Sequence, residues 1–204
     1  MMRRISLALL IIASTQGWGQ SIAYMQGEQP EAFVLRNGPG KSELAHPVIE
    51  TKEWSKHGKA VIAFYEHEGK NESGEIENLI EGFIFLPNTD STFRKIRIDT
   101  FEQEGGPVHI RTVFFESFRK HRKLFVMCEW PQLLHADFGG TIYSTFVYDM
   151  PPGQAVDELQ IDQKLTKKFS DDSDLSFRDG RSTHAKYKSA TAVRRALRRM
   201  ESAK

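Results

Sequence analysis

The spacing of hydrophobic and polar residues predicts a series of β-strands across the middle of the chain. Residues 93–101 alternate charged side chains with isoleucine and threonine, which is the period-two pattern of a strand with one exposed face. Near-continuous apolar residues at 61–65 and 124–128 indicate largely buried strands. The segment 70–74 carries Asn, Ser and Gly and favours a hairpin turn. The predicted strands are 59–68, 75–86, 93–101, 108–115, 124–130 and 141–149.

The hydrophobic period changes near the end of the sequence. Apolar side chains recur there at i, i+3, i+4 and i+7, which predicts an amphipathic helix at about 190–201, capped by Ser189 or Thr191. The residues with this spacing are Val193, Ala196, Leu197 and Met200. Strands first and a helix last favour the α+β class, here mainly an antiparallel β-sheet with a C-terminal amphipathic helix.

The stretch between the last strand and this helix has no clean period. Residues 155–169 fit either a helix or mixed structure. Residues 170–183 are polar and charged, with three aspartates within four residues, so a flexible linker or long loop is expected there.

The first residues have the layout of a secretory signal peptide. Arg3 and Arg4 precede an apolar run at 7–13, and small residues follow, which places the leader at 1–19. Ser21 with Ala23 offers a second cleavage site slightly downstream. The apolar run is shorter than the roughly 20 residues that span a bilayer, so no transmembrane anchor is expected. The predicted location is therefore periplasmic or secreted.

The remaining sequence divides into an arm and one domain. Residues 20–58 are rich in proline, glycine and polar residues, and they are expected to form an irregular N-terminal arm with one short strand at 32–35. Residues 59–204 are expected to form a single β-rich α+β domain.

Composition excludes several classes of protein. The chain has 28 Lys and Arg against 27 Asp and Glu, and loss of Arg3 and Arg4 leaves 26 against 27, so no nucleic-acid partner is expected. Fourteen Phe, five Tyr and three Trp supply an ordered core.

Cys128 is the one cysteine of the sequence, so an intramolecular disulfide is impossible. The apolar neighbours of Cys128 indicate an inert, buried thiol.

The sequence matches none of the metal-site or cofactor-site motifs tested against it. The seven histidines include no His-x-His or His-x-x-x-His pair, so they carry no zinc signature. Residues 172–183 break the calcium-loop pattern, because Phe177 replaces the required glycine and Thr183 the closing glutamate. The Gly-Gly pairs precede predicted strands, whereas a phosphate cradle needs a helix after the glycines. The sequence therefore predicts neither a metal nor a cofactor.

Two pairs of residues are weak catalytic candidates. Glu66 and Glu68 fall on one face of a strand and could divide acid and base roles in sugar hydrolysis. A solvated strand end explains the same residues. His135 and Asp137 could form an acid–base pair in the loop before Gly139. A loop whose side chains bond the local backbone is the alternative.

The predicted C-terminal helix offers a candidate partner-binding surface. Two arginine pairs lie on the side away from its apolar stripe, and they could meet phosphates, anionic lipid or an acidic partner. These residues are Arg194, Arg195, Arg198 and Arg199. The helix has only one narrow apolar stripe and no aromatic residue, so deep membrane insertion is not expected. A helix simply docked on the protein surface is the alternative.

Several short stretches resemble uncharacterised exported bacterial proteins. They are Trp130-Pro131, 139–143, 147–149, 186–190 and Val193-Arg194. The resemblance implies a bacterial envelope location and carries no activity. The leading hypothesis is a non-enzymatic binding protein for an envelope protein or polymer. The alternatives are an envelope hydrolase that uses the acidic or His/Asp residues, and a subunit that docks on an envelope complex through the basic helix.

Overall fold

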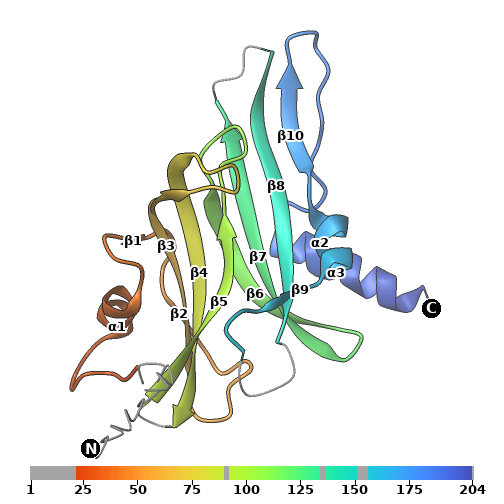
Figure 1. Cartoon of the computed structure of the whole chain (residues 1–204). Helices are drawn as coiled ribbons and strands as arrows, with labels where there is room; N and C mark the ends of the chain where they lie inside the picture. The colour runs from red at the N-terminus through yellow and green to blue at the C-terminus, as the bar shows by residue number, and fades with distance from the viewer. Residues whose placement is uncertain (1–21, 90–91, 134–136, 151–155, 204) are drawn as a thin grey trace, which may run out of the picture.

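The computed structural model describes residues 22–89, 92–133, 137–150 and 156–203. The expected leader at 1–19 and the candidate His135 lie outside these residues. Two antiparallel sheets form the body of the molecule (Figure 1). Sheet A has the order β1 (Glu43–Leu44), β3 (Ala60–Lys70), β4 (Ile76–Thr89), β5 (Thr92–Phe101), and β2 (Ile49–Thr51) also pairs with β3. Sheet B has the order β10 (Asp172–Phe177), β8 (Phe138–Asp149), β7 (His121–Gln132), β6 (His109–Phe118), and β9 (Gln160–Ile161) also pairs with β8.

The main core lies between the two sheets. Ile62 and Phe64 of β3 face Val126 and Cys128 of β7 within one cluster of buried side chains. This arrangement follows from strand alternation, because every second residue points to the same face. Cys128 is fully buried, and burial raises the pKa of its thiol well above the ordinary value, so the thiol stays protonated. It is a packing residue, as its apolar neighbours predicted.

Helices cover both outer faces of the sheets. Helix α1 (Pro30–Asn37) packs on sheet A through Phe33 and Val34. Helices α2 (Gln163–Phe169) and α3 (Ala190–Ser202) pack on the outer face of sheet B. Figure 1 shows the resulting four layers, with α1 on one side and α2 and α3 on the other. No helix in the described part of the chain is both long and apolar enough to cross a membrane.

The predicted strands and the C-terminal helix are confirmed, with later ends than expected for several of them. The apolar runs at 61–65 and 124–128 have both faces buried because a helix layer covers each sheet from outside. Strand β7 continues through Pro131 to Gln132, and β8 already begins at Phe138. The glycine pair of the predicted loop therefore lies inside a strand.

Two predictions about irregular segments are wrong. Residues 32–35 are helical rather than extended, since Pro30 pre-sets the first turn and Phe33 and Val34 gain a buried face on sheet A. The supposed linker at 170–183 contains β10, which pairs with β8 over its full length. The segment 155–169, left open between helix and mixed structure, holds β9 and α2, with Asp162 accepting a hydrogen bond from the Leu165 N–H as N-cap.

Residues 157–159, called here the strap, join sheet A to sheet B by backbone hydrogen bonds to β5. One side-chain hydrogen bond joins the sheets beside it. The Arg97 N–H donates to the Asp157 carbonyl, and the Leu159 N–H donates to the Arg97 carbonyl. Beside this strap, the Tyr148 hydroxyl donates to Asp99 Oδ2 at 2.6 Å. Burial, followed by the charge of Asp99, raises the pKa of Tyr148 well above its ordinary value, so the hydroxyl remains a donor.

Replacing Tyr148 with phenylalanine is expected to lower the free energy of unfolding by about 1–2 kcal/mol. The ring still fills its buried position, and Asp99 still accepts the Thr100 N–H. Urea unfolding measures the loss. Tyr143→Phe is the control, because within the described residues its hydroxyl forms no hydrogen bond. Equal stability of the two variants would show that the Tyr148 bond contributes nothing.

Candidate functional site

Sheet B holds α3 in one fixed orientation. Val193 and Leu197 are buried in the cluster that α2 and α3 share with sheet B. The Ser189 side chain caps the first turn by accepting a hydrogen bond from the Ala192 N–H. Arg194 adds an ion pair with Glu116 of β6 at 2.9 Å. These contacts also fix which faces of α3 point away from sheet B.

One of these faces borders a hollow between α2 and α3, called here the α2–α3 groove. Its volume is about 390 Å³, which falls within the roughly 300–1,000 Å³ typical of ligand sites. Residues from α2, from the connection before α3 and from α3 itself contribute to it. They are Lys168, Lys186, Tyr187, Ala192, Arg195, Ala196, Arg199 and Met200.

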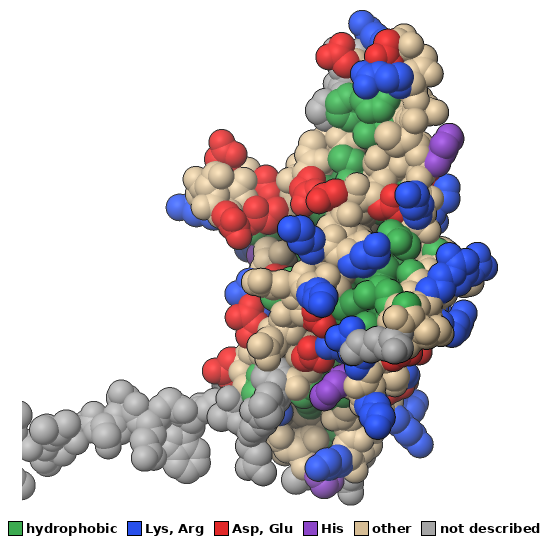
Figure 2. Space-filling view, turned by 90° about the vertical axis from the view of Figure 1, so that its right-hand side faces the viewer, with side chains coloured by type: hydrophobic (Ala, Val, Ile, Leu, Met, Phe, Trp, Pro, Cys, Tyr) green, Lys and Arg blue, Asp and Glu red, His purple; other side chains and the backbone are tan. Residues whose placement is uncertain are grey.

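The groove has an apolar floor and cationic walls. Its alanines, Tyr187 and Met200 are half-buried, whereas its lysines and arginines are exposed. Figure 2 shows this face of the molecule, where Lys and Arg side chains surround an apolar patch. Lys168 also lies over the Tyr187 ring, with its ammonium 5.8 Å from the ring centre. Such a surface combines attraction for anions with apolar contact area.

The cations of the groove have no acidic partner among the described residues. Lys168, Lys186, Arg195 and Arg199 take part in none of the ion pairs found there. Cations nearby behave differently: Lys188 pairs with Asp174 at 2.7 Å. The groove therefore carries positive charge that the described part of the fold leaves uncompensated.

The four arginines predicted as a partner-binding set have three different environments. Arg194 pairs with Glu116 and lies 4.6 Å from the centre of the Phe114 ring, so it holds the helix on sheet B. Arg195 and Arg199 line the groove. Arg198 is exposed and lies outside the groove lining. Sequence spacing alone cannot separate them, because each pair consists of adjacent residues.

Strand β10 positions one wall of the groove. Asp172 accepts a hydrogen bond from the Tyr187 N–H, and Asp174 accepts one from the Ala185 N–H at 2.8 Å. The hydrogen bond from Lys188, followed by that from Ala185, lowers the pKa of Asp174. These carboxylates stabilise the connection before α3, which includes Lys186. The acidic run that predicted a linker therefore has a structural role.

The described catalytic candidates, Glu66, Glu68 and Asp137, lie at two different sheets. Glu66 and Glu68 are exposed at the end of β3 in sheet A, where Asn78 donates a long 3.4 Å hydrogen bond to Glu66. Asp137 is exposed just before β8 in sheet B, and its carbonyl accepts the Arg178 N–H. Within the described ranges, no hydrogen bond joins these carboxylates. The same part of the chain contains no cluster of three His, Cys, Asp or Glu able to hold a metal.

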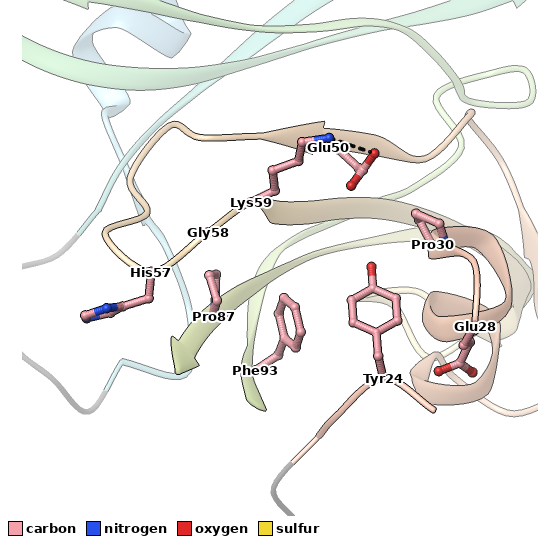
Figure 3. A pocket seen from close by; sticks show the side chains of 9 residues that line it. All are labelled: Tyr24, Glu28, Pro30, Glu50, His57, Gly58, Lys59, Pro87 and Phe93. Carbon is pink, nitrogen blue, oxygen red and sulfur yellow. Dashed lines mark hydrogen bonds and ion pairs between the residues drawn. The ribbon is translucent and has the colours of Figure 1, made fainter. Parts of the chain in front are cut away.

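A second hollow of about 370 Å³ lies where the N-terminal arm meets the β2–β3 loop (Figure 3). Tyr24 and Phe93 form its apolar part. Its charges are already compensated, since Lys59 pairs with Glu50 at 3.3 Å and Glu28 is hydrogen bonded by Arg36. Figure 3 shows the His57 side chain pointing away from the two rings. This hollow has less to offer a charged ligand than the groove.

The groove offers cationic hydrogen-bond donors to an anion. Guanidinium groups can donate paired hydrogen bonds to a carboxylate or phosphate. Among the described residues, the groove lining contains no carboxylate, histidine or cysteine that could act as a base or nucleophile. Comparison of the chain with protein-family models, with curated proteins and with solved structures finds no match.

Proposed function

We propose that this chain is an exported, non-enzymatic binding protein that captures an anionic partner of the cell envelope through the α2–α3 groove. The observation that carries the proposal is the set of four exposed cations without an acidic partner in the described structure. They project from helices and a connection that are fixed on sheet B. A pre-formed site loses little conformational entropy on binding.

The export part of this proposal rests on the N-terminal sequence pattern, and contacts just after it bear on the cleavage position. The Ile22 carbonyl accepts a hydrogen bond from the Phe93 N–H, and the Ala23 carbonyl accepts one from Arg36. Cleavage after Gly19 preserves both contacts, whereas cleavage after Ala23 removes them. We therefore favour the upstream cut and a periplasmic or secreted location.

The layer arrangement supports the α+β class. The helices cover the outer faces of two antiparallel sheets and do not connect parallel strands. This arrangement leaves helix surfaces exposed on the outside of the molecule, which is where the groove lies.

Reversing two charges of the groove is expected to weaken binding of a polyanion at least tenfold. In Lys168→Glu/Arg199→Glu, two hydrogen-bonding cations become carboxylates that repel the ligand, and charged hydrogen bonds contribute about 1.5–3 kcal/mol each. Isothermal titration calorimetry with heparin as the anionic probe measures the effect. At about 150 mM salt, charges farther than roughly 8 Å from the ligand are screened.

A matched control uses the neighbouring cations on the same two helices. Lys167→Glu/Arg198→Glu changes the net charge equally, but both residues are exposed outside the groove lining. The control is expected to retain heparin binding within about threefold, since it acts only through screened, longer-range charge. An equal loss in both double variants, or in neither, would contradict the groove as the binding site.

A further inference from the structure

We infer that the occupant of the α2–α3 groove is an acidic amphipathic helix of a partner protein, with an apolar stripe bordered by carboxylates. This inference rests on the proposed function, and it names the partner class for the same groove. It follows from the shape of the floor, the placement of the walls and the spacing of the cations along α3.

The floor of the groove needs an occupant with apolar side chains. Ala192, Ala196 and Met200 follow one another at intervals of four residues, so they form one apolar ridge along α3. Tyr187 extends this floor toward α2. A polyphosphate or sulfated polymer could satisfy the cations, but it has no apolar group to cover this ridge. The hydrophobic effect therefore favours a ligand that carries both kinds of group.

The same floor does not fit a lipid bilayer. Helices that lie on membranes insert apolar side chains below the headgroups. The exposed large hydrophobic residues of the described chain lie on other elements, and α2 and α3 contribute none. They are Met25, Leu35, Ile76 and Leu133. The groove presents its apolar side chains between projecting cations, so the partner has to supply the side chains that enter.

The cation spacing matches a helix. Arg195 and Arg199 are four residues apart on α3, which separates them by about 6 Å along the helix axis. Glutamates four residues apart on a second, aligned helix have the same separation. Lys168 and Lys186 come from α2 and from the connection before α3, not from α3 itself, so the groove offers cations from more than one element to carboxylates that border an apolar stripe. Small residues such as Ala192 and Ala196 allow the second helix to come close.

The cationic track continues past the end of the groove. Met200 also borders a smaller cavity of about 130 Å³, together with Lys164 of α2 and Arg119 of the β6–β7 turn. The cavity lining includes one carboxylate, that of Asp162, which is paired with Lys123. Lys164 is exposed and forms no ion pair with any described residue. The thirteen residues of α3 give the track a length of about 20 Å. A partner helix of three to four turns therefore matches the whole surface.

The test uses two synthetic peptides of about 14 residues with identical composition. In one, leucines recur at i, i+3, i+4 and i+7 with glutamates on both borders of the stripe; in the other, the same residues are scrambled to remove the stripe. Fluorescence anisotropy at about 150 mM salt measures both affinities. We expect the patterned peptide to bind at least tenfold more tightly than the scrambled one. Equal affinities would overturn the inference.

Two variants then separate the floor from the walls. Ala192→Gln adds bulk to the floor without changing charge, and it is expected to weaken patterned-peptide binding at least fivefold while heparin binding is unchanged. Thr191→Gln, on the exposed side of α3, is the matched control. An unchanged peptide affinity in Ala192→Gln would also overturn the inference. Circular dichroism melts verify that both variants fold.

The outcomes distinguish this inference from the proposed function. If the scrambled peptide and heparin bind as tightly as the patterned peptide, and all three are weakened by Lys168→Glu/Arg199→Glu, the groove binds anions but the helical partner is wrong. If that double variant changes no affinity, the proposed function fails as well. Binding to phosphatidylglycerol vesicles but to neither peptide would contradict the protein partner directly.

Discussion

Replacing Lys123 with alanine is expected to lower the free energy of unfolding by about 3–5 kcal/mol. The Lys123 side chain is only 8% exposed and forms ion pairs with Asp149 of β8 and with Asp162, the N-cap of α2. Alanine would leave two partly buried carboxylates without their shared cation. Because Asp162 also begins α2, the loss is expected to loosen that helix on sheet B.

Urea unfolding at pH 7 measures this loss, with Lys167→Ala as the control. Lys167 is exposed on α2 without an ion pair to any described residue, so its variant should stay within about 0.5 kcal/mol of the wild type. Lys123→Met keeps the aliphatic stem but not the charge, and it should be destabilised as well. Wild-type stability in both Lys123 variants would show that this buried cation is dispensable.

The pH dependence of the same variants follows from Asp162. Burial raises its pKa, but hydrogen bonds from the Leu165 N–H and from Lys123 outweigh burial, so the pKa lies below the ordinary 3.8. A lowered folded-state pKa contributes stability above the unfolded value, and this stability is lost as the pH falls through the folded value. The gap between wild type and Lys123→Ala is therefore expected to narrow below about pH 4.

Replacing Gly140 with alanine is expected to detach β10 from β8 and to weaken groove binding at least tenfold. Gly140 has a φ of +138°, and a Cβ there would lie 2.0 Å from the Asp174 carbonyl oxygen. Backbone strain of this kind costs about 1–3 kcal/mol before any steric clash is added. Asp172 and Asp174 of β10 hold the connection that carries Lys186 and Tyr187, so the groove wall should move with the strand.

Hydrogen exchange at the β10 amides, followed by peptide binding, measures both consequences. Gly180→Ala is the matched control, because Gly180 also has a positive φ of +85° but no atom within 4 Å of an added Cβ. It carries the same kind of backbone strain without the clash. Protected β10 amides in Gly140→Ala would refute the role of this close approach.

The sequence predicted the six long strands β3 to β8, because β5 keeps its alternation in the burial of its residues and β3 and β7 carry apolar runs that are buried on both faces. It did not predict that the strands divide into two sheets, since the pattern within one strand is the same in either case. Strand β10 was missed because its half-exposed residues and aspartates resemble a solvated linker. These aspartates accept hydrogen bonds from the backbone N–H groups of residues 185 and 187. Such contacts join separate segments of the chain, so they produce no periodic pattern in the local sequence.

The candidate site was predictable only in part. An amphipathic helix with excess arginine was evident, and Arg195 and Arg199 were among the residues named for partner binding. The other wall was missed, because Lys168 and Lys186 belong to segments without a clear period. Arg194 could not be told from Arg195, since only the docking of α3 on Glu116 and Phe114 separates neighbouring residues of one helix.

The groove can form only after the strands of sheet B that support it have been made. Its lining residues run from Lys168 to Met200, whereas β3 to β8, which provide its support, all come earlier in the sequence. A chain that emerges with its N-terminal end first can pair these strands before any residue of the groove has been made. If the proposed function holds, capture of a partner becomes possible only once synthesis or translocation has passed residue 200, the last residue of the groove lining.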